Sequence, residues 1–307
     1  MQVRCPICME SMPGKVGLDF CPLCRLYIGP PRPFRIRAED FLAPGDRDVT
    51  DNLREVKFLG EIVNRSLMVL QRPLVWNALL KGCSRLDPRH PAWSLSMKAA
   101  AQLCLDKAPR MFLCRNGGSI FTIGSNDDPS IIIGQSALEN IGVDELEAIL
   151  AHENAHIKAR HVEYFTLLRL FLDGFLVMTG SSLAMNLIVD LLLKKWRRSA
   201  ELSADRGAII ATGDPSSMKS ALLKLHRRSS LNGEMKLRDL GYIEGLARSL
   251  KSHPNLKDRV NALEFFYRSE DYRETRRKVE KNKEIREILK DGIVDCNKYI
   301  YIRSRGN

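Results

Sequence analysis

Apolar positions recur at helical spacing over several long segments of this chain. The clearest segment is 143–161, which neither proline nor glycine interrupts, so we expect a helix there. Asp144 followed by Glu147 predicts a capping box at its start. Two further helices are expected at residues 54–81 and 96–107. The apolar stripe of the first segment consists of Val143, Leu146, Ile149 and Leu150.

Three short apolar runs predict strands rather than helices. The runs "RMFLC" and "SIFTIG" are joined by Asn116-Gly117-Gly118, which is typical of a hairpin turn. A third run, "SIIIG", precedes the long helix. We therefore predict an α+β fold, mainly helical, with a small antiparallel sheet between the helices.

At 307 residues the chain exceeds the length at which single cores usually stop growing, so several units are expected. Residues 1–30 carry clustered cysteines, and the proline-rich stretch "GPPRPFRIR" opens a linker over residues 31–50. The main unit is expected over residues 51–268. Residues 269–307 are rich in Lys, Arg and Glu and predict a charged C-terminal helix and tail.

Four of the eight cysteines form two Cys-Pro-X-Cys turns separated by twelve residues. Two such turns are typical of a closed Cys₄ site in a structural zinc ribbon. A pair of disulfides and a rubredoxin-like iron site are the alternatives. No secretory signal peptide precedes the first turn, so we expect zinc. The four cysteines of the predicted site are Cys5, Cys8, Cys21 and Cys24.

The remaining four cysteines show no metal-binding spacing, and we expect them to be reduced, partly buried thiols. Reduced thiols indicate a reducing compartment. We therefore expect a cytoplasmic protein, or one on the cytoplasmic face of a membrane. These four residues are Cys83, Cys104, Cys114 and Cys296.

The string "HENAH" lies within the predicted helix 143–161. Because residues four apart share a helix face, His152 and His156 can present two imidazole nitrogens to one zinc ion. Glu153 beside them could take a proton from a zinc-activated water as general base. So short a string recurs in unrelated chains, and a surface helix with two histidines is the alternative.

A catalytic zinc ion needs a third protein ligand, and "SAELSADRGAII" offers Glu201. Asp205 follows four residues later on the same helical face, where its carboxylate could accept the free ring N–H of a zinc-bound histidine. The alternative is an ordinary acidic pair on a basic helix. Together with "HENAH", the spacing favours a zinc site.

These motifs, in this order, resemble those of the HtpX-like and CAAX prenyl protease family of zinc metallopeptidases. The resemblance covers residues 54–268 and includes "SIFTIG", "SIIIG", "HENAH", "AELSAD" and "SHPNLKDRVNAL". It implies a zincin-like metallopeptidase fold. It also implies that His152, His156 and Glu201 are zinc ligands and that Glu153 is the general base. Asp205 is implied as the carboxylate that binds a ligand histidine.

The resemblance further implies that "SIFTIG" is an edge strand to which an extended substrate adds by main-chain hydrogen bonds. It places His253 and Arg259 near the metal, in a catalytic role that supports the tetrahedral oxyanion. Asn154 departs from the apolar residue usual in the family, and Ser119-Ile120 replaces the usual Asn-Ala before Phe121; both departures affect the expected substrate preference. The implied substrate-binding residues are Ser119, Ile120, Phe121 and Thr122.

The segment 165–193 is mostly apolar and lies between the predicted ligands. A single membrane crossing would separate His156 from Glu201, and two crossings need about 40 residues. We therefore expect a helical hairpin that packs on the protein or dips into one leaflet, with peripheral membrane association. The net charge of +11 suits an anionic membrane surface. Nucleic-acid binding is not expected, because aromatic residues do not alternate with the basic ones.

The sequence thus predicts a zinc metalloendopeptidase with one catalytic and one structural zinc ion, acting on protein or peptide substrates in membrane-linked quality control. One alternative is a non-catalytic zinc-binding adaptor, against which the intact Glu153 argues. Another is an SprT-like protease acting on DNA-bound proteins. That family uses a third histidine, and only His161 lies near the motif.

Overall fold

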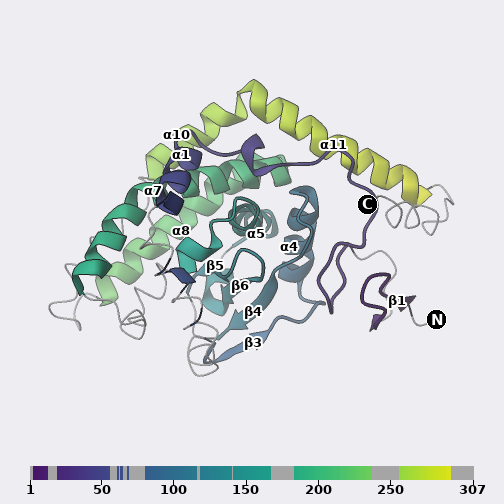
Figure 1. Ribbon diagram of the computed structural model, residues 1–307, viewed down its shortest axis with the longest axis horizontal. Coiled ribbons are helices and arrows are strands. Elements are labelled where there is room, and N and C mark those ends of the chain that lie inside the picture. The colour runs from purple at the N-terminus through teal and green to yellow at the C-terminus, as the bar shows by residue number, and fades with distance from the viewer. Residues whose placement is uncertain are drawn as a thin grey trace.

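The structure is a computed structural model that describes most of the chain, including both groups of candidate ligands. Helices dominate the described part, and a four-stranded sheet lies beside them (Figure 1). The predicted α+β class is confirmed. The described residues are 3–12, 19–55, 61, 63–64, 68, 80–115, 118–139, 141–166, 183–236 and 256–291.

Helix α5 (Val143–Lys158) lies at the centre of the fold, where it packs against α4, α7 and α8 and against strand β5. Figure 1 shows α10 and α11 passing over these helices on the side away from the sheet. The alanine-rich stripes of α5 and α7 face each other in the main core. The other helices are α1 (Asp46–Glu55), α4 (Pro91–Gln102), α7 (Leu183–Thr212), α8 (Pro215–Lys236), α10 (Leu256–Tyr267) and α11 (Glu270–Asp291), with 3-10 turns at Ala38–Asp40 and Gln135–Leu138.

The cap of α5 lies two residues before the predicted one. Gly142 is the N-cap, and its backbone N–H donates to the Glu145 carboxylate at 2.8 Å. The predicted box of Asp144 with Glu147 is therefore wrong, and Glu147 forms an ion pair with Lys98 of α4 instead. In both the predicted and the observed arrangement, a carboxylate at the third helical position binds the N–H of the capping residue. The two arrangements differ in which residue is the cap.

The other two predicted helices agree only in part. The helix expected at 96–107 begins earlier, at Pro91, where the His90 ring accepts the Ala92 N–H at 3.2 Å, and it ends at Gln102. Proline is favourable in the first turn because its missing N–H would have no partner there. The prediction for 54–81 falls mostly outside the described residues.

The sheet is mixed, and the predicted antiparallel arrangement is wrong. Its strand order is β3-β4-β6-β5, with β4 parallel to β6 and the two outer pairs antiparallel. The predicted hairpin between β4 and β5 does not exist, because β6 lies between them. The strands are β3 (Cys83–Arg85), β4 (Arg110–Cys114), β5 (Ile120–Gly124) and β6 (Pro129–Gly134).

The hairpin lies instead between β5 and β6, where Gly124 pairs with Pro129. Gly124 has a φ of 124°, and a Cβ atom there would lie 2.7 Å from the backbone oxygen of Asp128. Only glycine fits this position without strain. The tight return keeps β5 at the edge of the sheet and next to α5.

Cys83 and Cys114 are directly opposite each other on β3 and β4 and are joined by a disulfide. The prediction that both are free thiols is therefore wrong. Strand pairing brings their Cα atoms to 3.9 Å although 31 positions separate them in the chain. Cys104 is a buried free thiol, as predicted, and Cys296 lies outside the described residues.

The segment expected to be a linker contributes directly to the main core. Ile36 and Phe41 are each only 1% exposed and belong to the main core. Thr275 and Lys278 of α11 contact Asp40 from the other side of the segment. Residues 34–50 are therefore packed between α7 and α11 rather than extended between two units.

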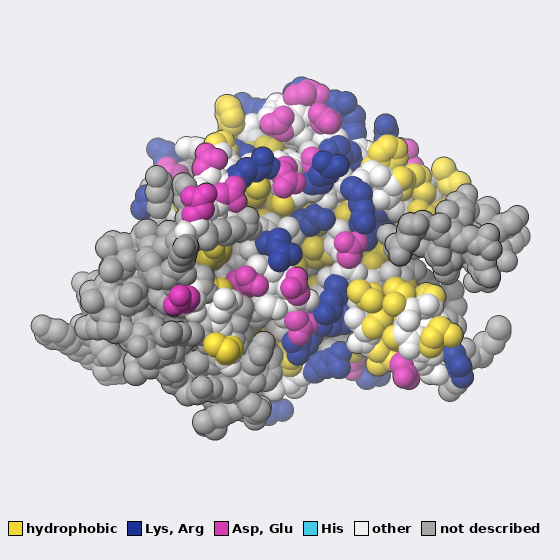
Figure 2. Space-filling view, in the orientation of Figure 1, with side chains coloured by type: hydrophobic (Ala, Val, Ile, Leu, Met, Phe, Trp, Pro, Cys, Tyr) yellow, Lys and Arg dark blue, Asp and Glu magenta, His cyan; other side chains and the backbone are white. Residues whose placement is uncertain are grey.

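The N-terminal ribbon, with strands β1 (Val3–Arg4) and β2 (Ser11–Met12), is joined by backbone hydrogen bonds to the segment 106–108, which precedes β4. Tyr27 donates to the Asp106 oxygen at 2.9 Å, and Ala108 donates to the Arg25 oxygen at 2.8 Å. Figure 2 shows hydrophobic side chains gathered on the side of the molecule where the ribbon lies. The ribbon itself exposes three large apolar side chains, Ile7, Met9 and Leu23.

None of the helices among the described residues is long and apolar enough to cross a membrane. The turn of the expected hairpin 165–193 falls in residues 167–182, outside the described part.

Candidate metal centre

The three predicted zinc ligands lie together on two helices. His152 and His156 of α5 are one turn apart, with their Nε2 atoms 3.1 Å from each other, and Glu201 approaches from α7. One ligand atom from each of the three side chains lies within 4.8 Å of the other two. All three residues are buried.

Small side chains allow α5 and α7 to approach this closely. Gly207 of α7 faces Ala155 of α5, and a Cβ atom at Gly207 would lie 2.4 Å from the Ala155 Cβ. Ala204 and Ala208 continue the same stripe on either side. Because Glu201 lies less than two turns before Gly207 on α7, this contact sets how near its carboxylate comes to the histidines.

Asp205 and Arg259 form a buried hydrogen-bonded group behind the ligands. The Asp205 Oδ1 atom lies 2.9 Å from His152 Nδ1. Arg259 donates from Nε and Nη2 to the same carboxylate at 2.8 and 2.6 Å, and its Nη1 atom lies 3.0 Å from Glu201 Oε2. All three guanidinium nitrogens are thus engaged by the two carboxylates.

The charges of Asp205 and Arg259 favour the tautomer of His152 that has its free lone pair on Nε2. Burial would raise the pKa of Asp205, but Arg259 and His152 outweigh burial and lower it, so the carboxylate stays charged. Burial would likewise lower the pKa of His152, and the charge and hydrogen bond of Asp205 raise it. A charged acceptor at Nδ1 keeps the proton on that nitrogen and leaves Nε2 free for a metal.

Glu153 projects from α5 toward the edge strand β5. Its Oε2 atom accepts a hydrogen bond from the Thr122 hydroxyl at 2.6 Å. Burial raises the pKa of Glu153 to about 7, although His152 and the Thr122 hydroxyl act to lower it. A carboxyl group with a pKa near neutrality can both accept and return a proton under physiological conditions.

The donor set fits zinc. Two imidazoles and one carboxylate are the ligands of many catalytic zinc sites, which leave a fourth position open. Burial, and then the neighbouring His152, place the pKa of His156 well below its usual value, so its ring is neutral as a metal ligand requires. The chemistry and burial of the three side chains therefore match a catalytic zinc ion.

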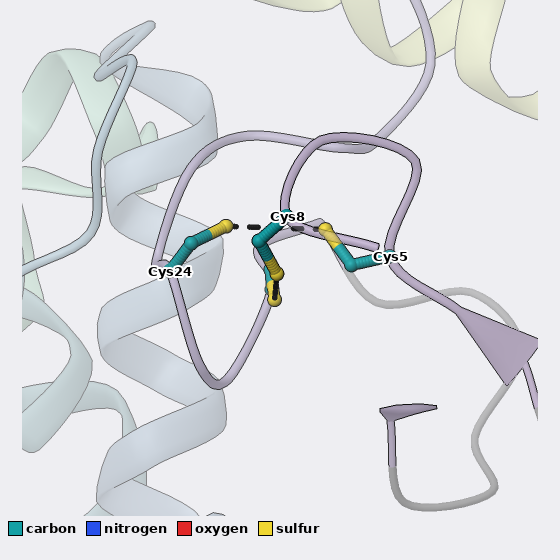
Figure 3. Close-up of side chains that lie close together, drawn as sticks. Cys5, Cys8 and Cys24 are labelled. Carbon is teal, nitrogen blue, oxygen red and sulfur yellow. Dashed lines mark hydrogen bonds between the residues drawn. The ribbon is translucent and has the colours of Figure 1, made fainter. Parts of the chain in front are cut away.

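The four cysteines of the ribbon form the second group of ligands. The Sγ atoms of Cys5 and Cys24 are 3.9 Å apart, as are those of Cys8 and Cys21. Figure 3 shows the side chains of Cys5, Cys8 and Cys24 pointing toward one another. This separation is too long for a disulfide. It is close to the roughly 3.8 Å edge of a tetrahedron with zinc–sulfur bonds of about 2.3 Å.

Backbone N–H groups also point at the sulfur atoms. Ile7 donates to Cys5 Sγ and Leu23 to Cys21 Sγ, both at 3.4 Å. Against the opposing effect of burial, such backbone bonds lower the pKa of the Cys5 thiol to about 7. Donors aimed at sulfur stabilise thiolates, which are the form that binds metal. The Cys₄ group therefore also fits zinc.

The remaining predicted site residues divide into three groups. Ile120 to Thr122 begin the edge strand β5 and Ser119 directly precedes it, so the predicted edge is present beside α5. Arg259 is held by Asp205 and Glu201 as described above. His253 lies outside the described residues.

Asn154 points away from the ligands. Its amide donates to the Ser96 hydroxyl at 3.0 Å and to the Leu150 backbone oxygen at 2.8 Å, and it is fully buried between α5 and α4. The sequence-based link between Asn154 and substrate preference therefore has no geometric basis, because the side chain binds another helix.

Sequence reasoning missed two contacts to the site, those of Thr122 and Asp46. Thr122 was expected only to bind substrate, and no pattern linked its hydroxyl to Glu153. Asp46 lies in the segment expected to be a linker, yet it contacts His161, which contacts His156. The spacing of five residues between His156 and His161 was visible in the sequence, but it indicated no role.

A helix with two histidines and a glutamate between them, completed by a glutamate from a later helix, defines the class of zinc metallopeptidases. Comparison with known proteins narrows this class. Residues 119–265 match the model of peptidase family M48, a range that includes the three ligands and Asp205.

Known relatives agree with this match. The plastoglobule-localized metallopeptidase 48 of Arabidopsis thaliana is 30% identical over 216 residues, which are 66% of this chain and 60% of the relative. A protease HtpX homolog of Janthinobacterium is 23% identical over 241 residues, 68% of this chain and 82% of the relative. Protease HtpX homolog 2 of Methanosarcina mazei is 24% identical over 183 residues, 47% of this chain and 61% of the relative.

The chain is therefore similar to the M48 peptidases over residues 119–265, and two of these relatives carry the name HtpX. It spans about 60% of the length of the plant and Methanosarcina mazei relatives.

Proposed function

We propose that this chain is a zinc metalloendopeptidase. The observation that carries the proposal is the position of the Glu153 carboxylate beside the group of His152, His156 and Glu201, within a domain of family M48. We further propose two zinc ions, one at this group and one at the four ribbon cysteines.

Zinc at the histidine–glutamate group would polarise the scissile carbonyl and lower the pKa of a water molecule bound there. Glu153 takes the proton from the attacking water and returns it to the leaving amine. The Thr122 hydroxyl holds one of its carboxylate oxygens, so the other oxygen faces the proton that moves. A pKa of about 7 suits both steps.

The ligand group needs support because two carboxylates, those of Glu201 and Asp205, are buried close to each other. Asp205 holds the His152 ring, and Arg259 balances the negative charge of Asp205 and Glu201. We assign Arg259 a positioning role, since its nitrogens already donate to these two carboxylates.

We propose that an extended substrate pairs with the outer edge of β5. The Gly134 N–H donates to the Ser119 oxygen, so in this antiparallel pair every second residue from Ser119 bonds to β6. The backbone groups of Ile120 and Thr122 then face away from the sheet. At Gly124, which also faces outward, the hydroxyl of Thr166 bonds the N–H and the oxygen, and this limits the open edge to the first part of the strand.

Membrane-linked quality control remains part of the proposal. It is supported by the apolar sequence of 165–193 and by the net charge of +11. Flotation of the purified chain with liposomes that contain anionic lipid tests it. Recovery of the protein in the lipid-free fraction at low salt would contradict membrane association.

Casein hydrolysis tests the enzymatic proposal. We expect the zinc-loaded protein to cleave casein, a chelator to stop cleavage, and added zinc to restore it. A folded protein that binds zinc at both sites and cleaves neither casein nor short peptides would favour the adaptor alternative.

A further inference from the structure

A second chain of hydrogen-bonding groups reaches His156, the candidate ligand that Asp205 does not contact. The Nδ1 atom of His156 lies 3.1 Å from Nδ1 of His161, and Nε2 of His161 lies 3.2 Å from Oδ2 of Asp46. His161 and Asp46 are at most 1% exposed. The contacts therefore run from the ligand ring to a buried carboxylate through one further imidazole.

Only one arrangement of protons lets His156 bind a metal through Nε2. Asp46 is a carboxylate and accepts, so the proton of the neutral His161 ring is on Nε2. The Nδ1 atom of His161 then carries a lone pair and accepts from Nδ1–H of His156. That leaves the lone pair of His156 on Nε2, the atom that faces His152 Nε2.

The surroundings of Asp46 keep it charged and oriented. Thr50 donates to its Oδ1 atom at 3.2 Å, and Ser203 of α7 donates to Oδ2. The indole of Trp196 donates to Thr50 at 2.9 Å, and its ring packs edge-on with the ring of His161. Burial would raise the pKa of Asp46, but His161, Ser203 and Thr50 together lower it, so the acceptor at the end of the chain remains a carboxylate.

We propose that Asp46 and His161 are positioning residues for the zinc ligand His156, equivalent in action to Asp205 behind His152. The inference rests on the proposed zinc site and not on proteolysis. Asp46 precedes the residues that match family M48, at 119–265. The segment at the start of α1 is therefore part of the metal centre, and the two ligand histidines are each held by a carboxylate from a different helix.

The affinity of the histidine–glutamate group for zinc tests the proposal in the full-length protein. We would measure it by competition with a chelator, and follow cobalt in place of zinc, because cobalt without sulfur ligands has a spectrum distinct from the Cys₄ site. Asp46→Asn and His161→Phe are expected to weaken binding about 10- to 100-fold, the usual effect of losing such a partner.

Two comparisons separate positioning from general damage. Asn154→Leu changes a buried polar side chain on the same helix that faces α4, and we expect it to leave zinc affinity unchanged. The double variant Asp46→Asn with His161→Phe is expected to bind zinc no more weakly than the worse single variant, because both residues act through one chain of contacts. Unchanged affinity in folded single variants, equal loss in Asn154→Leu, or additive losses would overturn the proposal.

A measurement on the wild-type protein tests the proposal even if the variants do not fold. Nitrogen NMR of the zinc-loaded chain should show the proton of His161 on Nε2 and that of His156 on Nδ1. A proton on Nδ1 of His161 would overturn the inference. These experiments measure zinc binding and proton position, so they can contradict the positioning role even if the protein cleaves casein. A wild type that binds no zinc at the histidine–glutamate group would instead refute the proposed function.

Discussion

Gly207 on α7 and Ala155 on α5 lie in direct contact, and this contact joins the helix that carries Glu201 to the helix that carries the histidines. A Cβ atom at Gly207 would come within 2.4 Å of the Ala155 Cβ, which is closer than two carbon atoms can pack. The metal centre thus depends on a residue that binds no metal.

We expect Gly207→Ala to lower the free energy of unfolding by about 1–3 kcal/mol, the usual cost of overpacking a core. It should also weaken zinc binding, because separating the helices moves Glu201 from the histidines. Chemical denaturation and chelator competition measure the two effects. Gly142→Ala is the control, since a Cβ there meets its nearest atom only at 3.6 Å. Equal zinc affinity in both variants would show that the spacing of α5 and α7 does not determine the site.

The metal-free protein should lose stability as pH rises through the titration of Glu153. Its pKa is about 7 in the fold and 4.5 in an ordinary setting, so the folded state binds this proton more tightly than the unfolded state. The contribution is fully present below about pH 4.5 and is lost by about pH 7, with a total near 3 kcal/mol.

Glu153→Gln cannot titrate at this position, so it should lack that part of the pH dependence. Urea unfolding of both metal-free proteins between pH 4.5 and about pH 7.5 gives the difference directly. If the two stability curves ran parallel across this window, the buried carboxyl group would not have the raised pKa.

Asn154→Leu should destabilise the protein by about 1–3 kcal/mol because it removes the buried amide that bonds Ser96 and Leu150. Peptide cleavage preference should stay the same, since the side chain faces α4. Thermal unfolding and the cleavage pattern of a mixed peptide library are the measurements. Altered cleavage sites with unchanged stability would assign Asn154 to the substrate site after all.

Replacing Cys5 and Cys8 together by serine should remove one zinc ion per chain and lower the melting temperature. The melting temperature falls because the ribbon is hydrogen-bonded to the segment 106–108 before β4, through the backbone N–H groups of Tyr27 and Ala108. Peptide hydrolysis should persist at temperatures where the variant is folded, since the cysteines do not contact the histidine–glutamate group. Zinc content, circular dichroism and hydrolysis rate measure the three effects. Complete loss of hydrolysis in a folded variant would mean that the two zinc sites are coupled.

Local spacing explains why the sequence located the candidate ligands. His152 and His156, like Glu201 and Asp205, are four apart, and a helix alone brings such residues to one face. The capping residue was misplaced because Glu145 and Glu147 are both acidic residues in the first turns of α5, and the position of the cap depends on the loop before it.

Contacts between distant segments could not be predicted in this way. The parallel pairing of β4 with β6 depends on the turn at Gly124, whereas the glycines after β4 gave a stronger turn pattern. The disulfide of Cys83 with Cys114 depends on strand register. Asp46 reaches the site only because the proline-rich segment folds back onto the core, and no periodic pattern in that segment indicated this.

The most direct test compares casein hydrolysis by the wild type and by Glu153→Gln, with the zinc content of both proteins determined. We expect equal zinc content and a loss of hydrolysis of about 100-fold or more in the variant, because the general base is missing while the ligands remain. Equal hydrolysis by the two zinc-loaded proteins would contradict the assignment of Glu153, and the absence of hydrolysis in both would contradict the peptidase.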